Sequence, residues 1–220
     1  MTELILHSYF RSSTSTRLRA ALNLKGLEAR YVAHHLVRDE HRDPAFLAIN
    51  PQGLLPALEL RGAPGGDVAL TQSLAIIEWL DETWPDPPLL PADPLGRARV
   101  RALSQAIACE VHAVNNLRVL RRLREQFGAD DAAVAAWFRH WVAETLAPLE
   151  RMLRDDPRTG AFCHGDAPGM ADLCLYAQVL NNRRFDVNMA PYPTIMRIFD
   201  ACEAVPEIAR AAPANQPDAE

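Results

Sequence analysis

The apolar residues change their spacing part-way along the chain. Up to about Trp84 the apolar period alternates between two residues, which is typical of strands, and 3.6 residues, which is typical of helices. Beyond Pro94 only the helical period remains. We therefore expect a mixed α/β segment followed by an all-helical segment.

Short apolar runs alternate with periodic stretches in the first segment. Strands are predicted at 4–6, 31–35, 57–60 and 68–70, and helices at 14–25, 44–48 and 73–83. Gly26 follows the first helix at a position where helices commonly end, and the Gly/Pro loop at 62–66 predicts a hairpin. The predicted order is βαβαββα, with the first two strands parallel because a helix connects them.

A proline-rich segment separates the two parts. Five of the ten residues at 85–94 are proline, which cannot continue a helix and favours an extended connection. After it, the spacing predicts one long helix through 100–114, another through 134–153, and shorter helices at 171–184 and 194–203. We expect domains at 1–84 and 95–220, joined by a linker at 85–94.

The composition is that of an ordinary globular protein. Hydrophobic residues make up 49% of the 220 positions and charged residues 23%, which excludes a disordered or fibrous chain. A net charge of −5 has the wrong sign for a general binder of nucleic-acid phosphates.

No window approaches the roughly 20 apolar residues that span a bilayer, so the cytoplasm is the default location. The four cysteines form no CxxC pair, so neither a zinc knuckle nor a dithiol centre is predicted.

The turn between the first strand and the first helix carries a run of hydroxyl groups. Positions 12–15 read Ser-Ser-Thr-Ser. The amino terminus of a helix offers free N–H groups and a positive dipole end, which favour an anion. Spacing alone favours the simpler interpretation, in which Ser12 or Ser13 caps the helix. A cap accounts for one hydroxyl, however, and not for three.

Two further places combine turn residues with possible ligand contacts. Pro56 either begins an edge strand or forms a cis bond that turns the N–H and C=O of Leu55 toward an extended peptide ligand, and the sequence leaves both open. Gln72 and Ser73 begin the third predicted helix, where they can bind a carboxylate. Ordinary capping would also place a serine there.

In this order, on this pattern of elements, the segments resemble the cytosolic glutathione transferases, and among them the zeta class. The resemblance covers essentially the whole chain. The matching segments are 10–15 with 17–19 and 21–26, Asn50-Pro51, 55–58, 72–78, His112 with Asn115-Asn116, Arg184-Phe185, 191–193 and 216–218.

The resemblance implies a glutathione transferase fold: a thioredoxin-like amino-terminal domain that binds glutathione, and an all-helical domain that completes the substrate pocket. It also implies a homodimer. Enzymes of this class are known chiefly as maleylacetoacetate isomerases, and a bacterial branch acts on maleylpyruvate. The implied reaction of aromatic catabolism is addition of the glutathione thiolate to a conjugated cis double bond, rotation, and elimination to the trans isomer. Glutathione acts as a coenzyme, and no metal is needed.

The same resemblance suggests roles for individual residues. Ser12 is expected to donate a hydrogen bond to the thiolate, with Ser13 and Thr14 in support, although Thr14 replaces the cysteine of the usual Ser-Ser-Cys-Ser segment. Leu54 stands where many members have glutamine, which leaves Gln52 as a substitute. The expected glutathione contacts are His35, Gln52, Leu55, Pro56, Gln72, Ser73, His112 and Asn116.

A small dianionic substrate requires local cations in an acidic protein. The candidates are Arg11, Arg118 and Arg184. On a helix continuing from the 100–114 stretch, Arg118 falls about 60° from Leu103, on the apolar side. A ligand or a buried acid would have to compensate a charge there. Arg184 lies near a helix end, where a cation also complements the dipole.

Three hypotheses remain open from the sequence. The first is the isomerase; the second is another activity of the same scaffold, either a general glutathione transferase or dehalogenation of α-haloacids. The third is a non-catalytic binding module of the glutathione transferase fold, which the intact serines argue against.

His34 and His35 are neighbours on a predicted strand and point to opposite faces, so they cannot hold one metal ion together.

Overall fold

The computed structural model describes residues 2–220, which divide into two compact units. Of the described residues, the first unit joins 2–90 to Glu203–Glu220, and the second is Pro91–Cys202. The prediction from the sequence assigned Glu203–Glu220 to the helical domain. In the structure it groups with the first unit because its side chains and carbonyls bind α1 and β2, as described below.

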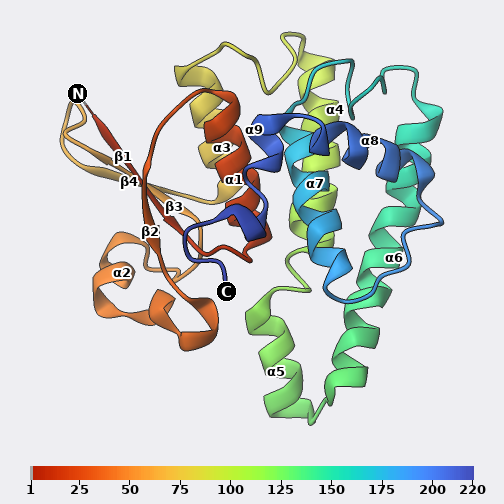
Figure 1. Ribbon diagram of the computed structural model, residues 1–220, viewed down its shortest axis with the longest axis horizontal. Helices are drawn as coiled ribbons and strands as arrows, with labels where there is room; N and C mark the ends of the chain where they lie inside the picture. Colours follow the sequence, from red (N-terminus) through yellow and green to blue (C-terminus); the bar gives the residue numbers. More distant parts are fainter. Residues whose placement is uncertain (1) are drawn as a thin grey trace. The chain divides into compact units, whose positions relative to one another are not determined.

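Within residues 2–220, one mixed sheet with the strand order β2-β1-β3-β4 forms the centre of the first unit (Figure 1). The strands are β1 (Glu3–Ser8), β2 (Arg30–Ala33), β3 (Ala57–Arg61) and β4 (Val68–Thr71). β1 pairs parallel with β2 and antiparallel with β3, which pairs antiparallel with β4. The helices are α1 (Ser13–Leu24), α2 (Pro44–Ile49), α3 (Ser73–Thr83), α9 (Pro206–Ala209), and the short 3₁₀ turns η1 (Leu36–Arg38), η2 (Glu40–Arg42) and η4 (Pro213–Asn215).

The strand register brings several loops to one edge of the sheet. Ala57 lies opposite His7 of β1 and opposite Thr71 of β4. The carboxyl ends of β1 and β4 therefore meet the amino end of β3, and β2 ends at the same edge because it runs parallel to β1. The loops that carry the predicted glutathione contacts of the first unit all leave from this edge.

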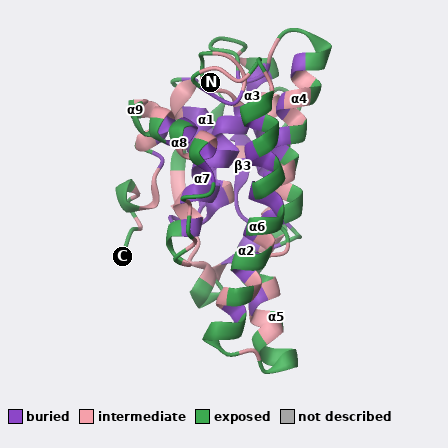
Figure 2. Ribbon diagram, turned by 90° about the vertical axis from the view of Figure 1, so that its right-hand side faces the viewer, coloured by how far each residue is buried: buried purple, intermediate pink, exposed green. Residues whose placement is uncertain are grey.

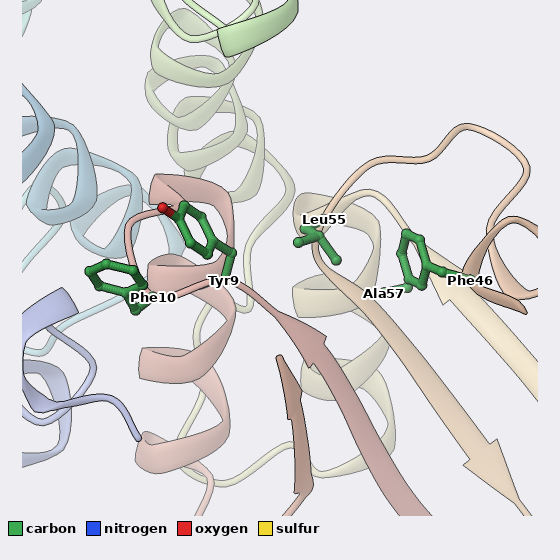
Figure 3. Packing of buried hydrophobic residues seen from close by; sticks show 5 residues of the cluster. All are labelled: Tyr9, Phe10, Phe46, Leu55 and Ala57. Carbon is green, nitrogen blue, oxygen red and sulfur yellow. The ribbon is translucent and has the colours of Figure 1, made fainter. Parts of the chain in front are cut away.

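Alternate residues of β1 face different helices, as the pleat of a strand requires. Leu6 lies beside Leu22 of α1 in one cavity lining, whereas the ring of His7 lies 5.5 Å from the ring of Phe46 on α2. A small buried cluster at the edge of the sheet joins the loop after β1 to the start of β3 (Figure 3). Its members are Tyr9, Phe10, Phe46, Leu55 and Ala57.

The second unit is helical throughout its regular structure. Its elements are α4 (Pro94–Gln105), the π-helical segment η3 (Ala106–Val111), α5 (Leu117–Phe127), α6 (Asp131–Asp155), α7 (Met170–Arg183) and α8 (Pro193–Glu203). α7 is the most completely buried of these helices and α5 is largely exposed (Figure 2). The predicted helices within 134–153, at 171–184 and at 194–203 correspond to α6, α7 and α8.

The predicted long helix through 100–114 is wrong in its second half. α4 passes into the π-helical segment η3, in which the N–H of His112 binds the carbonyl of Ile107 at 2.9 Å, five residues back. The chain then turns, and Asn116 caps a new helix, α5. A π-helical hydrogen bond spans five residues and an α-helical one spans four. The spacing of apolar residues does not distinguish the two over so short a segment.

The proline-rich segment between α3 and α4 is tethered. The ammonium group of Lys25 at the end of α1 binds Asp81 of α3 at 2.7 Å and the carbonyl of Pro87 at 2.5 Å. The N–H of Leu89 donates to the same carboxylate of Asp81 at 2.7 Å. Leu89 and Leu90 are buried. Among residues 2–220, no helix has the length and apolar content needed to cross a membrane.

Candidate functional site

The hydroxyl-rich turn begins α1 at the edge of the sheet. Ser12 has extended backbone geometry and is the N-cap of α1, and its Oγ accepts the N–H of Ser15 at 3.2 Å. The capping expected of a serine here is therefore real. Ser12 is 9% exposed and Ser13, the first residue of α1, is 6% exposed, so both are largely buried.

A second hydrogen bond links this cap to the loop before β3. The Oγ1 of Thr14 donates to the carbonyl of Leu55 at 2.9 Å, and the same Oγ1 lies 2.7 Å from the Oγ of Ser12. A hydroxyl has one proton, and a carbonyl can only accept. Since Thr14 gives its proton to Leu55, Ser12 must be the donor in the bond between the two hydroxyls. The hydroxyl proton of Ser12 therefore points to a neutral acceptor, the Oγ1 of Thr14, which another acceptor can replace.

The Leu55-Pro56 peptide bond is cis, one of the two possibilities that the sequence left open. Asn50, which is 1% exposed, shapes the loop before this bond. Its amide donates to the carbonyl of Leu54 at 2.7 Å and its Oδ1 accepts the N–H of Gln52 at 3.1 Å. The backbone of Leu55 is thereby held between Asn50 on one side and Thr14 on the other.

The start of α3 differs from an ordinary capped helix. Its N-cap is Gln72 rather than Ser73, and the Gln72 side chain makes no capping hydrogen bond. Gln72 has φ +67°, a left-handed conformation that is uncommon for a side chain of this kind and is found most often at functional sites. Its amide instead donates to the Oε1 of Gln52 at 2.9 Å. Simple capping by Ser73 does not explain this arrangement.

His34 and His35 point to different surroundings, as their places after β2 predict. The Nδ1 of His35 accepts the N–H of Arg38 at 3.2 Å, and its Nε2 lies 3.5 Å from the Tyr9 hydroxyl and 3.6 Å from Glu220. The Nε2 of His34 instead lies 2.8 Å from the Nδ1 of His7. His35 therefore belongs to the edge that carries Tyr9 and Ser12.

In the second unit, the turn after η3 places His112 beside Asn116. The amide nitrogen of Asn116 lies 3.4 Å from the Nε2 of His112, and its Oδ1 accepts the N–H of Arg118 as the cap of α5. Asn115 is buried, and its amide donates to the carbonyl of Phe138 at 3.2 Å. The three polar residues therefore lie in a turn, and not along one arc of a continuous helix.

The expectation for Arg118 is wrong in its geometry. Arg118 is exposed at the second position of α5. The 100° rotation per residue was extended from Leu103 across a π-helical segment and a turn, where that rotation does not hold. The predicted burial of the Arg118 charge therefore does not occur, and no buried acid is needed to compensate it.

The other two candidate arginines are exposed. Arg11 follows the small buried cluster, and its guanidinium lies 4.8 Å from the ring centroid of Phe10. Arg184 is the C-cap of α7, at the helix end predicted for it, with its guanidinium 5.9 Å from the ring centroid of Phe185. Phe185 itself stacks on Phe138, with ring centroids 3.8 Å apart.

Comparisons with known proteins assign the family. The model of the family described as "Glutathione S-transferase, N-terminal domain" matches residues 11–83. The chain is 49% identical over 211 residues to the maleylacetoacetate isomerase of Rhizobium meliloti (strain 1021), with 96% of each protein covered. It is 48% identical to a bacterial maleyl pyruvate isomerase of the zeta class, whose holo structure has a TM-score of 0.93 over 98% of this chain and 99% of that chain. The chain belongs to the zeta class of glutathione transferases.

A further relative of this zeta-class chain has been solved with ligands. The maleylacetoacetate isomerase of Anaeromyxobacter dehalogenans 2CP-1 is 42% identical and has a TM-score of 0.88, with 100% of this chain and 94% of that chain covered. Its structure contains dicarboxyethyl glutathione and citrate in the active site. The predicted glutathione transferase fold of our zeta-class chain is confirmed by these similarities.

Sequence reasoning missed several polar residues of this zeta-class structure. His7, on β1, lies between Glu59 at 2.6 Å and His34 at 2.8 Å. Burial, and next the neighbouring charge of His7, lower the pKa of His34 below its usual value. Alternation along β1 places His7 on the face of α2, but the partner on β3 requires the strand register, which the sequence did not supply. Among residues 2–220, no three His, Cys, Asp or Glu side chains are arranged to hold a metal ion.

Proposed function

We propose that this chain is a glutathione-dependent cis-trans isomerase of a small dianion with a maleyl group, either maleylacetoacetate or maleylpyruvate. One observation carries the proposal: the Ser12 hydroxyl lies at the amino end of α1 and is hydrogen-bonded through Thr14 to the Leu55 carbonyl. This places a donor for a sulfur anion next to a backbone acceptor for a peptide. Bound glutathione would supply the thiolate that adds to the cis double bond and leaves after rotation.

The donor set of the first unit fits glutathione. A tripeptide with two carboxylates and a thiolate needs several N–H or O–H donors and a few backbone acceptors. Ser12 offers a hydroxyl and the first turn of α1 offers a positive dipole end. Gln52 and Gln72 offer side-chain amides at the same edge of the sheet, where Gln72 leaves the start of α3 without a side-chain cap. We assign the cysteinyl backbone of glutathione to Leu55 and Pro56, and a carboxylate to Gln72 and Ser73.

Ser12 stabilises the thiolate in this proposal. An ordinary thiol titrates near 8.5, and each unit by which its pKa falls corresponds to about 1.4 kcal/mol in favour of the anion. A hydroxyl proton and the dipole of α1 both favour the charged sulfur. Because Ser12 gives its proton to another hydroxyl rather than to a charged group, turning it toward the sulfur exchanges a neutral hydrogen bond for a stronger, charge-assisted one.

The remaining candidates are assigned by family membership. We propose that Ser13 supports the thiolate site, that His35 faces the glycyl end of glutathione, and that His112 and Asn116 contact its carboxylates. Arg11, Arg118 and Arg184 would bind the substrate carboxylates and the charge that develops on addition. The relative that binds dicarboxyethyl glutathione together with citrate supports a site for several carboxylates beside glutathione.

Turnover of both cis substrates, followed by ultraviolet absorbance with and without glutathione, tests the proposal. We expect turnover only with glutathione, no net consumption of glutathione, and a loss of kcat of about a hundredfold in Ser12→Ala, which removes the donor to the sulfur. Ser15→Ala, at the position whose N–H rather than hydroxyl reaches Ser12, is the matched control.

The outcomes separate the rival functions. Loss of free glutathione during turnover would indicate a conjugating transferase, and release of halide from α-haloacids would indicate a dehalogenase. Two results together would indicate a binding module. The chain would bind glutathione without turning over either substrate, and Ser12→Ala would keep the biological activity of the unmodified protein.

We also propose a homodimer located in the cytoplasm. The dimer is proposed from membership of the family, for which the sequence resemblance implies a homodimer. Light scattering of the purified chain measures the mass directly. A monomer at micromolar concentration would exclude the dimer.

A further inference from the structure

Arg19, in the second turn of α1, is buried, and no carboxylate among residues 2–220 forms a direct ion pair with it. It is 4% exposed, and the five N–H groups of its guanidinium make six contacts with carbonyls and hydroxyls, so at least one N–H is shared between two acceptors. The acceptors are the carbonyl oxygens of Tyr9, Phe10 and Ala211 and the hydroxyls of Ser8 and Thr16. Arg19 therefore holds the backbone of the turn after β1 and the backbone of the carboxyl-terminal segment at the same time.

Asp218 holds the same turn from the other side. Its Oδ2 accepts the backbone N–H of Phe10 at 3.0 Å, and its Oδ1 accepts the hydroxyl of Tyr31 at 2.7 Å. Tyr31 comes from β2, next to β1 in the sheet. A residue 208 positions away along the chain thus binds the backbone two residues before Ser12.

The network combines a charged guanidinium, a neutral phenol and a carboxylate, from Arg19, Tyr31 and Asp218. Burial lowers the pKa of Arg19 to about 10, against the opposing effects of Tyr31 and Asp218, so the guanidinium stays charged at neutral pH. Burial also raises the pKa of Tyr31, which therefore remains a neutral donor to Asp218. A buried cation is costly unless hydrogen bonds and a counter-charge compensate it, and Asp218 is the carboxylate that supplies the counter-charge here.

The turn between these two side chains leads directly to Ser12. The N–H of Ser12 donates to the carbonyl of Tyr9 at 3.0 Å, and the same carbonyl accepts from Arg19 at 3.3 Å. Both backbone groups of Phe10 are also engaged, the N–H by Asp218 and the C=O by Arg19. These hydrogen bonds restrict the backbone from Tyr9 to Ser12, and so they restrict the position from which the Ser12 hydroxyl points.

We propose that Asp218 and Arg19 are positioning residues for Ser12, so that the segment from Ala211 to Asp218 forms part of the thiolate site. This inference rests on the proposed role of Ser12. Neither residue touches glutathione in it; both act by fixing the turn from Tyr9 to Ser12. A displacement of about 1 Å at a reacting group can cost on the order of a hundredfold in rate, so backbone hydrogen bonds of this kind can affect catalysis.

The test is the variant Asp218→Asn, which keeps the size and one acceptor oxygen but removes the charge that faces Arg19. The readout is the ultraviolet absorbance of the glutathione thiolate, titrated with pH in the binary complex with the full-length protein. We expect the apparent pKa of the bound thiol to rise by about half a unit, a threefold change in the thiolate equilibrium, and kcat at neutral pH to fall about tenfold. Glu207→Gln, which lies in the same carboxyl-terminal part of the first unit, Glu203–Glu220, but has its side chain outside the network, is the matched control and should leave both quantities unchanged.

The two proposals fail in different ways. A native protein that binds glutathione without lowering its thiol pKa contradicts the proposed role of Ser12. A native protein that lowers this pKa, together with an Asp218→Asn variant that lowers it equally and keeps kcat, overturns the present inference and leaves only structural anchoring. If Asp218→Asn does not fold, Tyr31→Phe removes one donor to the same carboxylate; we expect a smaller rise of the thiol pKa, and no rise would overturn the inference.

Discussion

At the scale of single residues, the hydroxyl of Thr14 distinguishes this chain from the usual zeta-class segment. It connects two groups that the proposed function uses separately, the Ser12 hydroxyl and the Leu55 carbonyl. A thiol at this position would be a weak donor and a weak acceptor. Threonine therefore holds the loop before β3 against α1 more firmly, and it provides Ser12 with a neutral acceptor that is easily exchanged.

Thr14→Val separates these two effects, because valine has a similar shape and no hydroxyl. The loop loses a hydrogen bond worth about 1 kcal/mol, so we expect the KM for glutathione to rise roughly fivefold. The Ser12 proton loses its competing acceptor, so the pKa of the bound thiol should not rise. Steady-state kinetics and thiolate absorbance measure the two quantities, with Thr14→Ser as the control. A rise of the thiol pKa equal to that in Ser12→Ala would instead mean that Thr14 contacts the sulfur itself.

Residue-level prediction from the sequence depended on whether a local element fixes the side chain. The position of Ser12 at the amino end of α1 could be predicted because a strand, a turn and a helix follow one another within a few positions. Arg118 could not, because its angle was extended from Leu103 across a helix that changes its period. Asp218 could not be assigned a partner, because only the folded chain brings it to Phe10.

At the scale of elements, the start of α7 shows how a glycine can begin a buried helix. Gly169 is the N-cap and has no side chain to accept a hydrogen bond. Asp172, which is 1% exposed, supplies the missing acceptor: its Oδ2 accepts the N–H of Gly169 at 2.8 Å and its Oδ1 accepts the N–H of Cys163 at 2.7 Å. One carboxylate thus joins the preceding loop to the helix.

Asp172→Ala should destabilise the second unit strongly, because the buried N–H of Cys163 and the partly buried N–H of Gly169 would lose their acceptor. Each such loss costs about 1–3 kcal/mol, so we expect the free energy of unfolding to fall by roughly 2–4 kcal/mol. Urea denaturation followed by circular dichroism measures this. Asp200→Asn, at an exposed position on α8, is the control. Equal midpoints in the two variants would show that water or other groups satisfy these N–H groups.

Elements were predictable where the apolar period stayed constant. The strands and helices of the first unit follow the predicted order, and α3 has the predicted bounds of 73–83. The exception lies between α4 and α5, where a π-helical segment and a turn interrupt a stretch whose apolar residues still suit one helix. The helix cap at Asn116 was the available signal, since asparagine is a preferred N-cap residue.

At the scale of the whole molecule, stability depends on pH through the partly buried imidazole of His34. His34 has a lowered pKa because of burial and the neighbouring His7. Below a pH of about 6.5 the unfolded chain therefore takes up a proton that the folded chain resists, and folding loses stability as the pH falls.

His34→Gln should flatten this dependence. We expect the difference in urea midpoint between pH 7 and pH 5.5 to be smaller in the variant than in the native protein. His140→Gln, at an exposed position on α6, is the control and should keep the native dependence. An unchanged slope in His34→Gln would mean that His34 does not account for the acid sensitivity.

The division of the molecule into units was the feature least accessible from the sequence. The change of period near Trp84 and the prolines of 85–94 locate the change from mixed to helical structure. They give no sign that Glu203–Glu220 joins the first unit. That assignment depends on contacts such as the one between Asn23 and the carbonyl of Glu207 at 2.8 Å, which join residues distant in sequence.

The discontinuous first unit has a consequence for synthesis on the ribosome. Translation delivers β1, α1 and the remaining strands early, then the entire second unit, and only afterwards Ala211 and Asp218. Until those two residues emerge from the exit tunnel, Arg19 lacks part of its hydrogen-bonding shell and the Phe10 N–H has no carboxylate to bind. A nascent chain can therefore assemble its sheet before Ala211 and Asp218 are accessible, but the geometry around Ser12 is completed only once these two residues have left the exit tunnel.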